Sequence, residues 1–177
     1  RRALDRGDWV RHSDEGYRLL PGVEVWLDTE QFVQHAEAGR AEESCGRADA
    51  AISRYEAAQA LYRSDLLEGD ENEPALAAEA QALRDCFSQV LERLAGLREQ
   101  AADWHGCLRT TLRHLGLDDC NEAAHRRLML CYAKLGQVQL AERQYRSCVS
   151  ALHQQFGLSP SDETTALYRR IAARLAA

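Results

Sequence analysis

The chain has 177 residues, 45% of them apolar, so it is long enough to bury a hydrophobic core as one main domain. Its 22 basic and 28 acidic residues give a net charge of −6, which argues against nucleic-acid binding by the chain as a whole, because phosphate binding needs a positive surface. It has no run of about 18 apolar residues and no signal-peptide core at its start, so we predict a cytoplasmic location. Since the first residue is Arg1 and not methionine, we expect a fragment of a longer protein.

The first residues predict a β-hairpin. Residues 9–11 and 17–19 contain Trp, Val, Tyr and Leu side chains that suit strands, and a polar loop ending in Gly16 separates them. Glycine suits this place because a tight turn often requires a positive φ. Valine and leucine then alternate with other residues over residues 23–27, which predicts one more short extended segment.

Most of the remaining chain predicts amphipathic helices. Only three prolines interrupt stretches that are rich in Ala, Leu, Glu, Arg and Gln, which are strong helix formers. Apolar residues recur at steps of three and four over residues 75–101, 122–134 and 138–154, so each segment has one apolar face. We expect these segments to pair as helical hairpins, with room for one break within residues 75–101.

Capping residues predict where two helices begin. Asp28, with Gln31 three positions later, fits a capping box in which Asp28 accepts from first-turn amides and Gln31 reaches back. Near the other end, Gly157 suits a left-handed helix terminus, and Ser159 before a proline suits the start of a final helix. We expect that helix to bury three side chains on one side: Leu167, Ile171 and Leu175.

An internal repeat gives the clearest prediction of the fold. Three sets of residues share intervals of five, four and three: Gly46, Ala51, Tyr55 and Ala58; Ala102, Cys107, Thr111 and His114; and Gly136, Ala141, Tyr145 and Cys148. A glycine or small residue lets the chain turn between antiparallel helices, and a small side chain five residues later lets their backbones approach closely. The copies lie 56 and then 34 residues apart, so the first two are separated by an additional segment.

These residue types resemble the tetratricopeptide repeat, most completely in the last copy. The resemblance implies an all-α array of tetratricopeptide-like helical hairpins, preceded here by the short β-hairpin. The middle copy departs from the pattern because Arg98 stands where an aromatic residue is expected.

Two blocks make the resemblance more specific. One is Ala60-Leu61-Tyr62-Arg63-Ser64-Asp65-Leu66-Leu67, and the other runs from His125 to Tyr168 and contains Phe156-Gly157-Leu158-Ser159-Pro160. Over residues 28–174 the chain resembles the bacterial transcriptional activator domain, the helical module behind a winged helix in regulators of the antibiotic regulatory protein class. The resemblance implies that residues 1–27 are the end of a winged-helix domain with its wing hairpin, and that residues 28–177 are the activator domain.

The resemblance also implies a role in transcription. Arg2 would lie at the tail of a recognition helix, and Arg11 and Arg18 would lie on the wing, where arginines contact phosphates or the minor groove. The alternative for Arg11 and Arg18 is a solvated hairpin face. The expected partners are DNA, through the intact winged helix, and a protein such as RNA polymerase or another regulator domain; a homodimer is a further arrangement left open.

Enzyme and metal chemistry are not predicted. The chain has no phosphate-cradling glycine loop, no nucleophile elbow and no H-E-x-x-H motif, so we expect no catalysis and no cofactor. The spacing of His105, Cys107, Cys120 and His125 admits a zinc site, but the repeat places Cys107 at a small core position. We therefore expect core residues and reduced thiols here.

A second function remains open at this point. The helical array alone is compatible with a tetratricopeptide-type protein interaction scaffold that has no role on DNA. An upstream basic helix-turn-helix would favour the regulator, and its absence would favour the scaffold.

Overall fold

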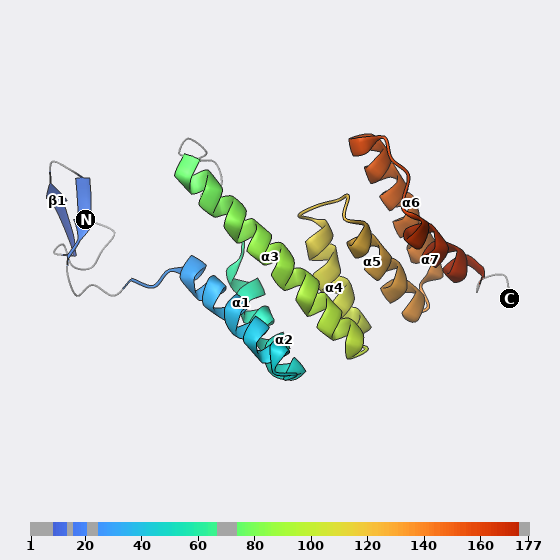
Figure 1. The fold of residues 1–177 in the computed structure, drawn as a ribbon, viewed down its shortest axis with the longest axis horizontal. Coiled ribbons are helices and arrows are strands. Elements are labelled where there is room, and N and C mark those ends of the chain that lie inside the picture. The colour runs from blue at the N-terminus through green and yellow to red at the C-terminus, as the bar shows by residue number, and fades with distance from the viewer. Residues whose placement is uncertain (1–8, 14–15, 21–24, 67–73, 174–177) are drawn as a thin grey trace.

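The computed structural model describes residues 9–13, 16–20, 25–66 and 74–173. In these residues a two-stranded antiparallel sheet precedes seven helices (Figure 1). The elements are β1 (Val10–Ser13), β2 (Gly16–Leu19), α1 (Asp28–Ser44), α2 (Ala48–Leu61), α3 (Pro74–Gln100), α4 (Trp104–Leu115), α5 (Glu122–Lys134), α6 (Val138–Phe156) and α7 (Asp162–Ala173). The predicted class, a mostly helical tetratricopeptide-like array behind a short hairpin, is confirmed.

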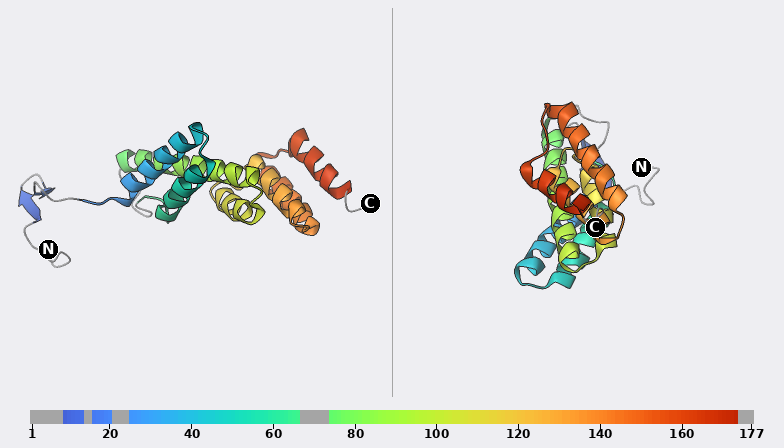
Figure 2. Two further views of the ribbon diagram at one scale, coloured as in Figure 1. Left: turned by 90° about the horizontal axis from the view of Figure 1, so that it is seen from below. Right: turned by 90° about the vertical axis from the view of Figure 1, so that its right-hand side faces the viewer.

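The first six helices pair as three antiparallel hairpins, α1 with α2, α3 with α4 and α5 with α6, and α7 packs on the last of them. Figure 2 shows that the hairpins follow one another along the long axis of the molecule. Contacts between α1 and α3, and between α5 and α7, join alternate helices of the stack. None of the helices in the described residues has the length and apolar character that a membrane span requires.

The turns within the three hairpins have the same backbone conformation. Gly46, Ala102 and Gly136 have φ values of 71°, 55° and 74°, and Ala102 is the one non-glycine residue with a positive φ in the described part of the chain. In each turn the next amide bonds to the carbonyl five residues earlier, as in Arg47 to Glu42 at 2.9 Å. This pattern is a Schellman motif, so the predicted repeat positions are confirmed at the turns.

Small side chains hold the paired helices close together. Ala51, Cys107 and Ala141 are fully buried, as the repeat predicts. In the first hairpin the two helices approach closely at Gly39, where an added Cβ would lie 2.5 Å from the Tyr55 ring. The aromatic ring therefore fills the space that the missing side chain leaves.

The additional segment between the first two copies belongs partly to α3, which is one continuous helix of 27 residues. The break that the sequence left open does not occur. The buried residues of α3 are Leu83, Phe87, Val90, Leu91, Leu94, Ala95, Leu97 and Arg98. These residues pack against α1 and α2 on one side of α3 and against α4 on the other. Helix α3 is therefore shared between the cores of the first two hairpins.

Both predicted caps need correction. The residue before α1 is Leu27, and it makes no side-chain cap. Asp28 is already helical and accepts from the Thr29 amide at 2.9 Å, while Gln31 donates forward to Gln34 at 3.4 Å, so no capping box forms. At the other end Gly157 is left-handed as predicted, with φ 67°, but Ser161 caps α7 in place of Ser159.

The β-hairpin is confirmed with Arg11 directly opposite Arg18. The predicted extended segment after it is not a strand over residues 25–27, because no partner strand pairs with it there, and residues 23 and 24 lie outside the described residues. Arg2, and the expected helix tail around it, also lie outside the described residues.

Replacing Ala102 with glycine should stabilise the chain by about 0.5–1 kcal/mol, because alanine is strained at positive φ. The matched change Gly136→Ala should destabilise by about 1 kcal/mol, since an added Cβ there meets no neighbouring atom and only the φ strain acts. Urea unfolding of the three proteins measures both effects. Equal midpoints would contradict the assigned left-handed turns.

Replacing Ala141 with leucine should overpack the last hairpin, because Ala141 is fully buried against Met129 and Ile171. We expect a loss of about 1–3 kcal/mol in the free energy of unfolding. The exposed residue Ala166, on α7, provides the control: Ala166→Leu should change stability by less than about 0.5 kcal/mol. Thermal melts in which both variants match the parent would show that Ala141 is not a packing position.

Candidate functional site

A groove runs between α5 and α7. Two adjoining hollows, of about 240 and 340 Å³, share Leu130, Leu167 and Arg170 and so form one continuous depression. The remaining lining residues are Ala133, Lys134 and Ile171 at one end and Glu99, Ala123, Arg126, Arg127 and Glu163 at the other. The first end is mainly apolar and the second is charged.

The helical repeat aims these side chains at one side of α5. The helix begins after Asn121, whose side chain accepts from the Ala124 amide at 2.9 Å. Ala123, Arg127, Leu130 and Lys134 then follow at steps of three or four, which places them on one face. The opposite face is buried against the neighbouring helices, as His125, Leu128 and Met129 show.

Positive charge exceeds negative charge along the groove. Its lining contains four cationic side chains (Arg126, Arg127, Lys134 and Arg170) and two anionic ones (Glu99 and Glu163). Two of the cations are paired, Arg126 with Glu163 at 3.2 Å and Arg127 with Glu99 at 3.0 Å. Arg170 has no ion pair with another described residue, and the Lys134 ammonium lies 5.5 Å from the centre of the Trp104 ring.

The position of α7 is set by a carboxylate of α5. Glu122 Oε2 accepts hydrogen bonds from the Ser161 amide at 2.9 Å, the Ser161 hydroxyl at 2.7 Å and the Thr164 hydroxyl at 2.6 Å. Partial burial alone would raise the pKa of Glu122, but the hydrogen bonds from Thr164 and Ser161 outweigh it and hold the pKa below its usual value. The Tyr145 and Tyr168 rings stack 4.1 Å apart and add a second anchor.

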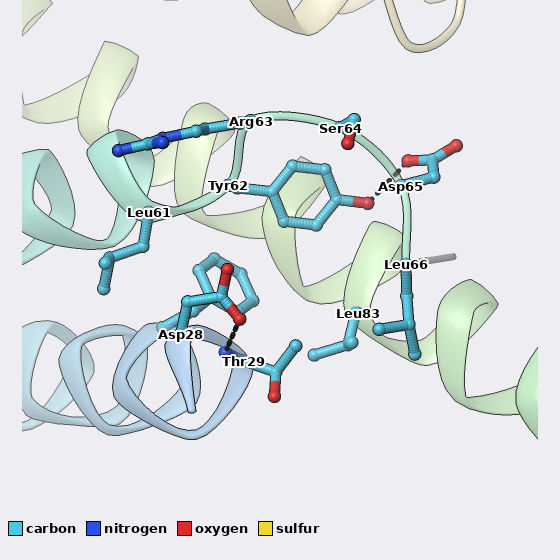
Figure 3. Close-up of a pocket in the computed structure, with 10 residues that line it drawn as sticks. Asp28, Thr29, Leu61, Tyr62, Arg63, Ser64, Asp65, Leu66 and Leu83 are labelled. Atoms are coloured by element: carbon cyan, nitrogen blue, oxygen red, sulfur yellow. Dashed lines mark hydrogen bonds between the residues drawn. The ribbon is translucent and has the colours of Figure 1, made fainter. Parts of the chain in front are cut away.

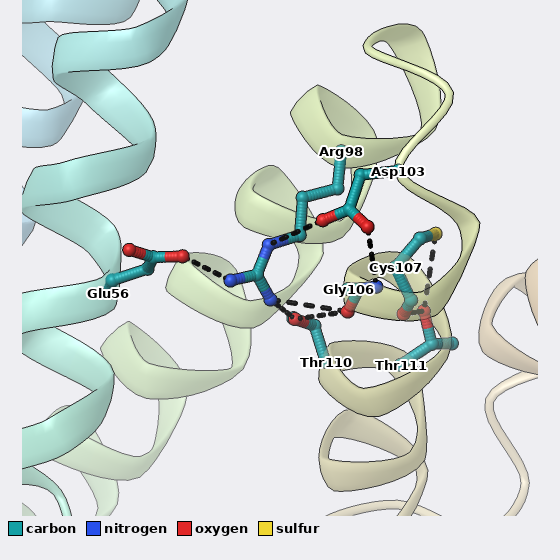
Figure 4. A network of polar contacts seen from close by, with 7 residues as sticks. All are labelled: Glu56, Arg98, Asp103, Gly106, Cys107, Thr110 and Thr111. Carbon is teal, nitrogen blue, oxygen red and sulfur yellow. Dashed lines mark hydrogen bonds and ion pairs between the residues drawn. The ribbon is translucent and has the colours of Figure 1, made fainter.

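A buried arginine joins the first hairpin to the second (Figure 4). Arg98 of α3 forms an ion pair with Glu56 of α2 and donates to Thr110 Oγ1 and, at 3.2 Å, to the Gly106 carbonyl of α4. Asp103 lies 3.8 Å from the same guanidinium. At the position where the repeat pattern expects an aromatic residue, Arg98 therefore forms a polar link between the first two hairpins.

Within the block of residues 60–67, the described residues 60–66 include the end of α2 and the segment that follows it. The Tyr62 hydroxyl donates to Asp65 at 2.7 Å, the Tyr62 ring stacks on Phe87 at 4.0 Å, and Arg84 forms an ion pair with Asp65. Burial, and then the Asp65 hydrogen bond, raise the pKa of Tyr62, so the hydroxyl stays protonated. The residues around it line a cavity of about 210 Å³ at the start of α1 (Figure 3).

Among the predicted DNA contacts, Arg11 and Arg18 are both exposed and lie side by side across the hairpin. The four zinc-type residues do not come together. His125 is buried with Nε2 2.9 Å from the Asp119 carbonyl and Nδ1 2.7 Å from the Gln144 amide nitrogen, and Cys107 is buried beside Cys131. In the described residues the one group near enough to share a metal ion is Asp118, Asp119 and Cys120, which is not that set.

The groove was not predicted from the sequence. Arg126 and Arg127 stood in the block that carries the family resemblance, and Leu167 was expected to be buried, but it is only half-buried and lines the groove. The three-and-four spacing on α5 was a signal for one face of a helix. It could not show that α7 lies opposite that face.

The family model described as bacterial transcriptional activator domain matches residues 27–172. The structure of Mycobacterium tuberculosis EmbR, determined with a low-affinity phosphopeptide, superposes with a TM-score of 0.69 at 20% identity; the match covers 94% of this chain and 44% of EmbR. The C-terminal TPR-containing domain of an FK506-binding protein of Plasmodium falciparum superposes with a TM-score of 0.59 at 14% identity, over 85% of this chain and 94% of that one. At these identities the two structures establish the fold. No protein of curated function matches the chain in sequence.

Replacing Glu122 with glutamine should weaken the attachment of α7 to α5, because the group that accepts hydrogen bonds from Ser161 and Thr164 loses its negative charge. We expect a loss of about 1 kcal/mol at neutral pH. The lowered folded-state pKa means that the carboxylate stabilises the fold above its unfolded pKa of about 4.5 and that this stability is lost as the pH falls through the folded value. The two proteins should therefore become equally stable in acid.

Urea unfolding over a pH series measures this difference. Glu142, which forms an exposed pair with Arg146 at 2.5 Å on α6, gives the matched control. Glu142→Gln should cost no more than about 0.5 kcal/mol. A difference between parent and Glu122→Gln that persists unchanged in acid would contradict the carboxylate anchor.

Proposed function

Because the chain belongs to the bacterial transcriptional activator domain family, a regulatory and non-catalytic domain, we propose that it is the helical effector part of a DNA-binding bacterial transcriptional regulator. The observation that carries this proposal is the family match over residues 27–172 directly behind a β-hairpin. In this proposal residues 1–27 end a winged-helix domain and residues 28–177 are the effector domain. The regulator acts in the cytoplasm, where its DNA is.

The hairpin is the proposed DNA contact. Arg11 and Arg18 stand directly opposite each other on the two strands, and both are exposed. Two neighbouring guanidiniums suit the phosphates of one strand or a narrow minor groove. Arg2, on the segment before the hairpin, completes the proposed set.

The groove between α5 and α7 is the proposed site for a protein partner. Stacked helical hairpins expose a surface that suits a helix or peptide, and this groove combines an apolar end with a charged end. RNA polymerase and another domain of the regulator are the candidate partners, with a second copy of the chain as the third. Each would use the helical body to hold the DNA-binding domain in a fixed place.

A protein interaction scaffold without a DNA role is the second candidate. Its support is the net charge of −6 and the likeness to a TPR-containing domain that covers 85% of the chain. The two candidates differ in one property, which is specific retention of DNA by the intact protein.

Replacing Arg11 and Arg18 with alanine in the intact protein should weaken specific DNA binding by roughly 5- to 30-fold, and the salt slope should fall by about 1 for each phosphate that is no longer neutralised. Arg54→Ala, an exposed change on α2, is the control and should leave binding unchanged. Mobility shifts at several salt concentrations measure both. An intact protein that retains no DNA would decide for the scaffold.

A further inference from the structure

We propose that the groove between α5 and α7 binds an acidic amphipathic segment of a protein partner, with aliphatic side chains on Leu130 and Leu167 and carboxylates on Arg170 and Lys134. This inference rests on the proposed function, since it names the chemistry of the partner that the effector domain holds. It adds the charge, the length and the side-chain pattern of that partner.

Charge complementarity selects an acidic occupant. The chain carries a net charge of −6, whereas the groove lining carries four cations and two anions. The two anions are already engaged by Arg126 and Arg127. Arg170 lies where the apolar and charged ends meet, and it has no carboxylate partner among the described residues. A carboxylate of the bound segment would form an ion pair with Arg170, and solvent ions would screen this attraction less in the groove than on a flat surface.

The apolar end selects a protein segment over a nucleic acid. Leu130, Leu167 and Ile171 form its floor, and an aliphatic side chain seated there would remove apolar surface from water on both partners. A phosphate group gains nothing from contact with this apolar surface, because the surface offers it no hydrogen-bond donor. A segment that alternates carboxylates with aliphatic residues fits both ends.

The length of the groove sets the length of the segment. The lining residues of α5 extend from Ala123 to Lys134, a span of about 16 Å at 1.5 Å per helical residue. A helical occupant of about 11 residues covers the same distance. Such a helix presents aliphatic side chains at steps of three and four along one side, which matches the helix-in-groove mode of recognition.

The test is binding of a designed probe to the chain itself. The probe is a fluorescein-labelled peptide of three Glu-Leu-Ala-Glu repeats, followed by fluorescence anisotropy up to about 1 mM protein, the weak end of specific binding. The control peptide has glutamine in place of each glutamate. We expect the acidic peptide to bind saturably and the control peptide to bind at least fivefold more weakly. Added salt should weaken binding of the acidic peptide.

Variants of the chain locate the binding. Arg170→Glu should weaken binding of the acidic peptide at least tenfold. Arg169 is the exposed neighbour on α7 and does not line the groove, so Arg169→Glu should change the affinity less than twofold. Thermal melts check that each variant folds. Lys134→Glu, at the exposed end of the groove, repeats the test if Arg170→Glu unfolds early.

Four results would overturn the proposal: no saturation by the acidic peptide, equal binding of the glutamine peptide, equal weakening in the Arg169 and Arg170 variants, or displacement of the peptide by a short DNA duplex. Sedimentation in which Arg170→Glu abolishes dimerisation of the chain would assign the groove to a second copy instead. Because these measurements use the chain without DNA, their failure is distinct from failure of the intact protein to retain DNA.

Discussion

Close approach of antiparallel helices at small residues is the constraint on which the structure depends. Three left-handed turns, at Gly46, Ala102 and Gly136, reverse the chain, and fully buried small residues stand five positions after each turn. Tight packing there gives dispersion contacts between the paired helices. Because each hairpin leaves one face uncovered, the next one must stack on it, and an elongated array follows.

Polar contacts add to the apolar packing between neighbouring elements of the stack. Arg98 ties the first hairpin to the second, and Glu122 holds α7 on α5. Arg113 of α4 bonds to the Gln59 carbonyl at 3.0 Å and to the Tyr62 carbonyl, at the end of α2 where a cation is favoured. Such directional links tolerate little sliding, so the groove beside α7 has a defined shape.

Periodicity predicted much of this fold, because the repeat intervals are enforced by packing. The turn at Ala102 was placed correctly even though its residue is not glycine, since the neighbouring copies fix the register. The caps were misplaced because several polar residues compete near each helix start: Ser161, and not Ser159, meets the α7 amides once Glu122 approaches from another helix. The contacts of Arg98 and the groove could not be predicted from the sequence either, because both bring together residues that are far apart in the chain.

The cysteines allow the packing register to be measured directly. Cys107, Cys131 and Cys148 are fully buried, Cys86 and Cys120 are partly buried, and Cys45 is exposed. Burial also raises the pKa of Cys148 to about 11. Iodoacetamide labelling of the native chain near pH 8, read by peptide mass spectrometry, should modify Cys45 first and the three buried thiols at least about 100-fold more slowly. Labelling of Cys107 and Cys148 as fast as Cys45 would show that these positions face water and would contradict the account.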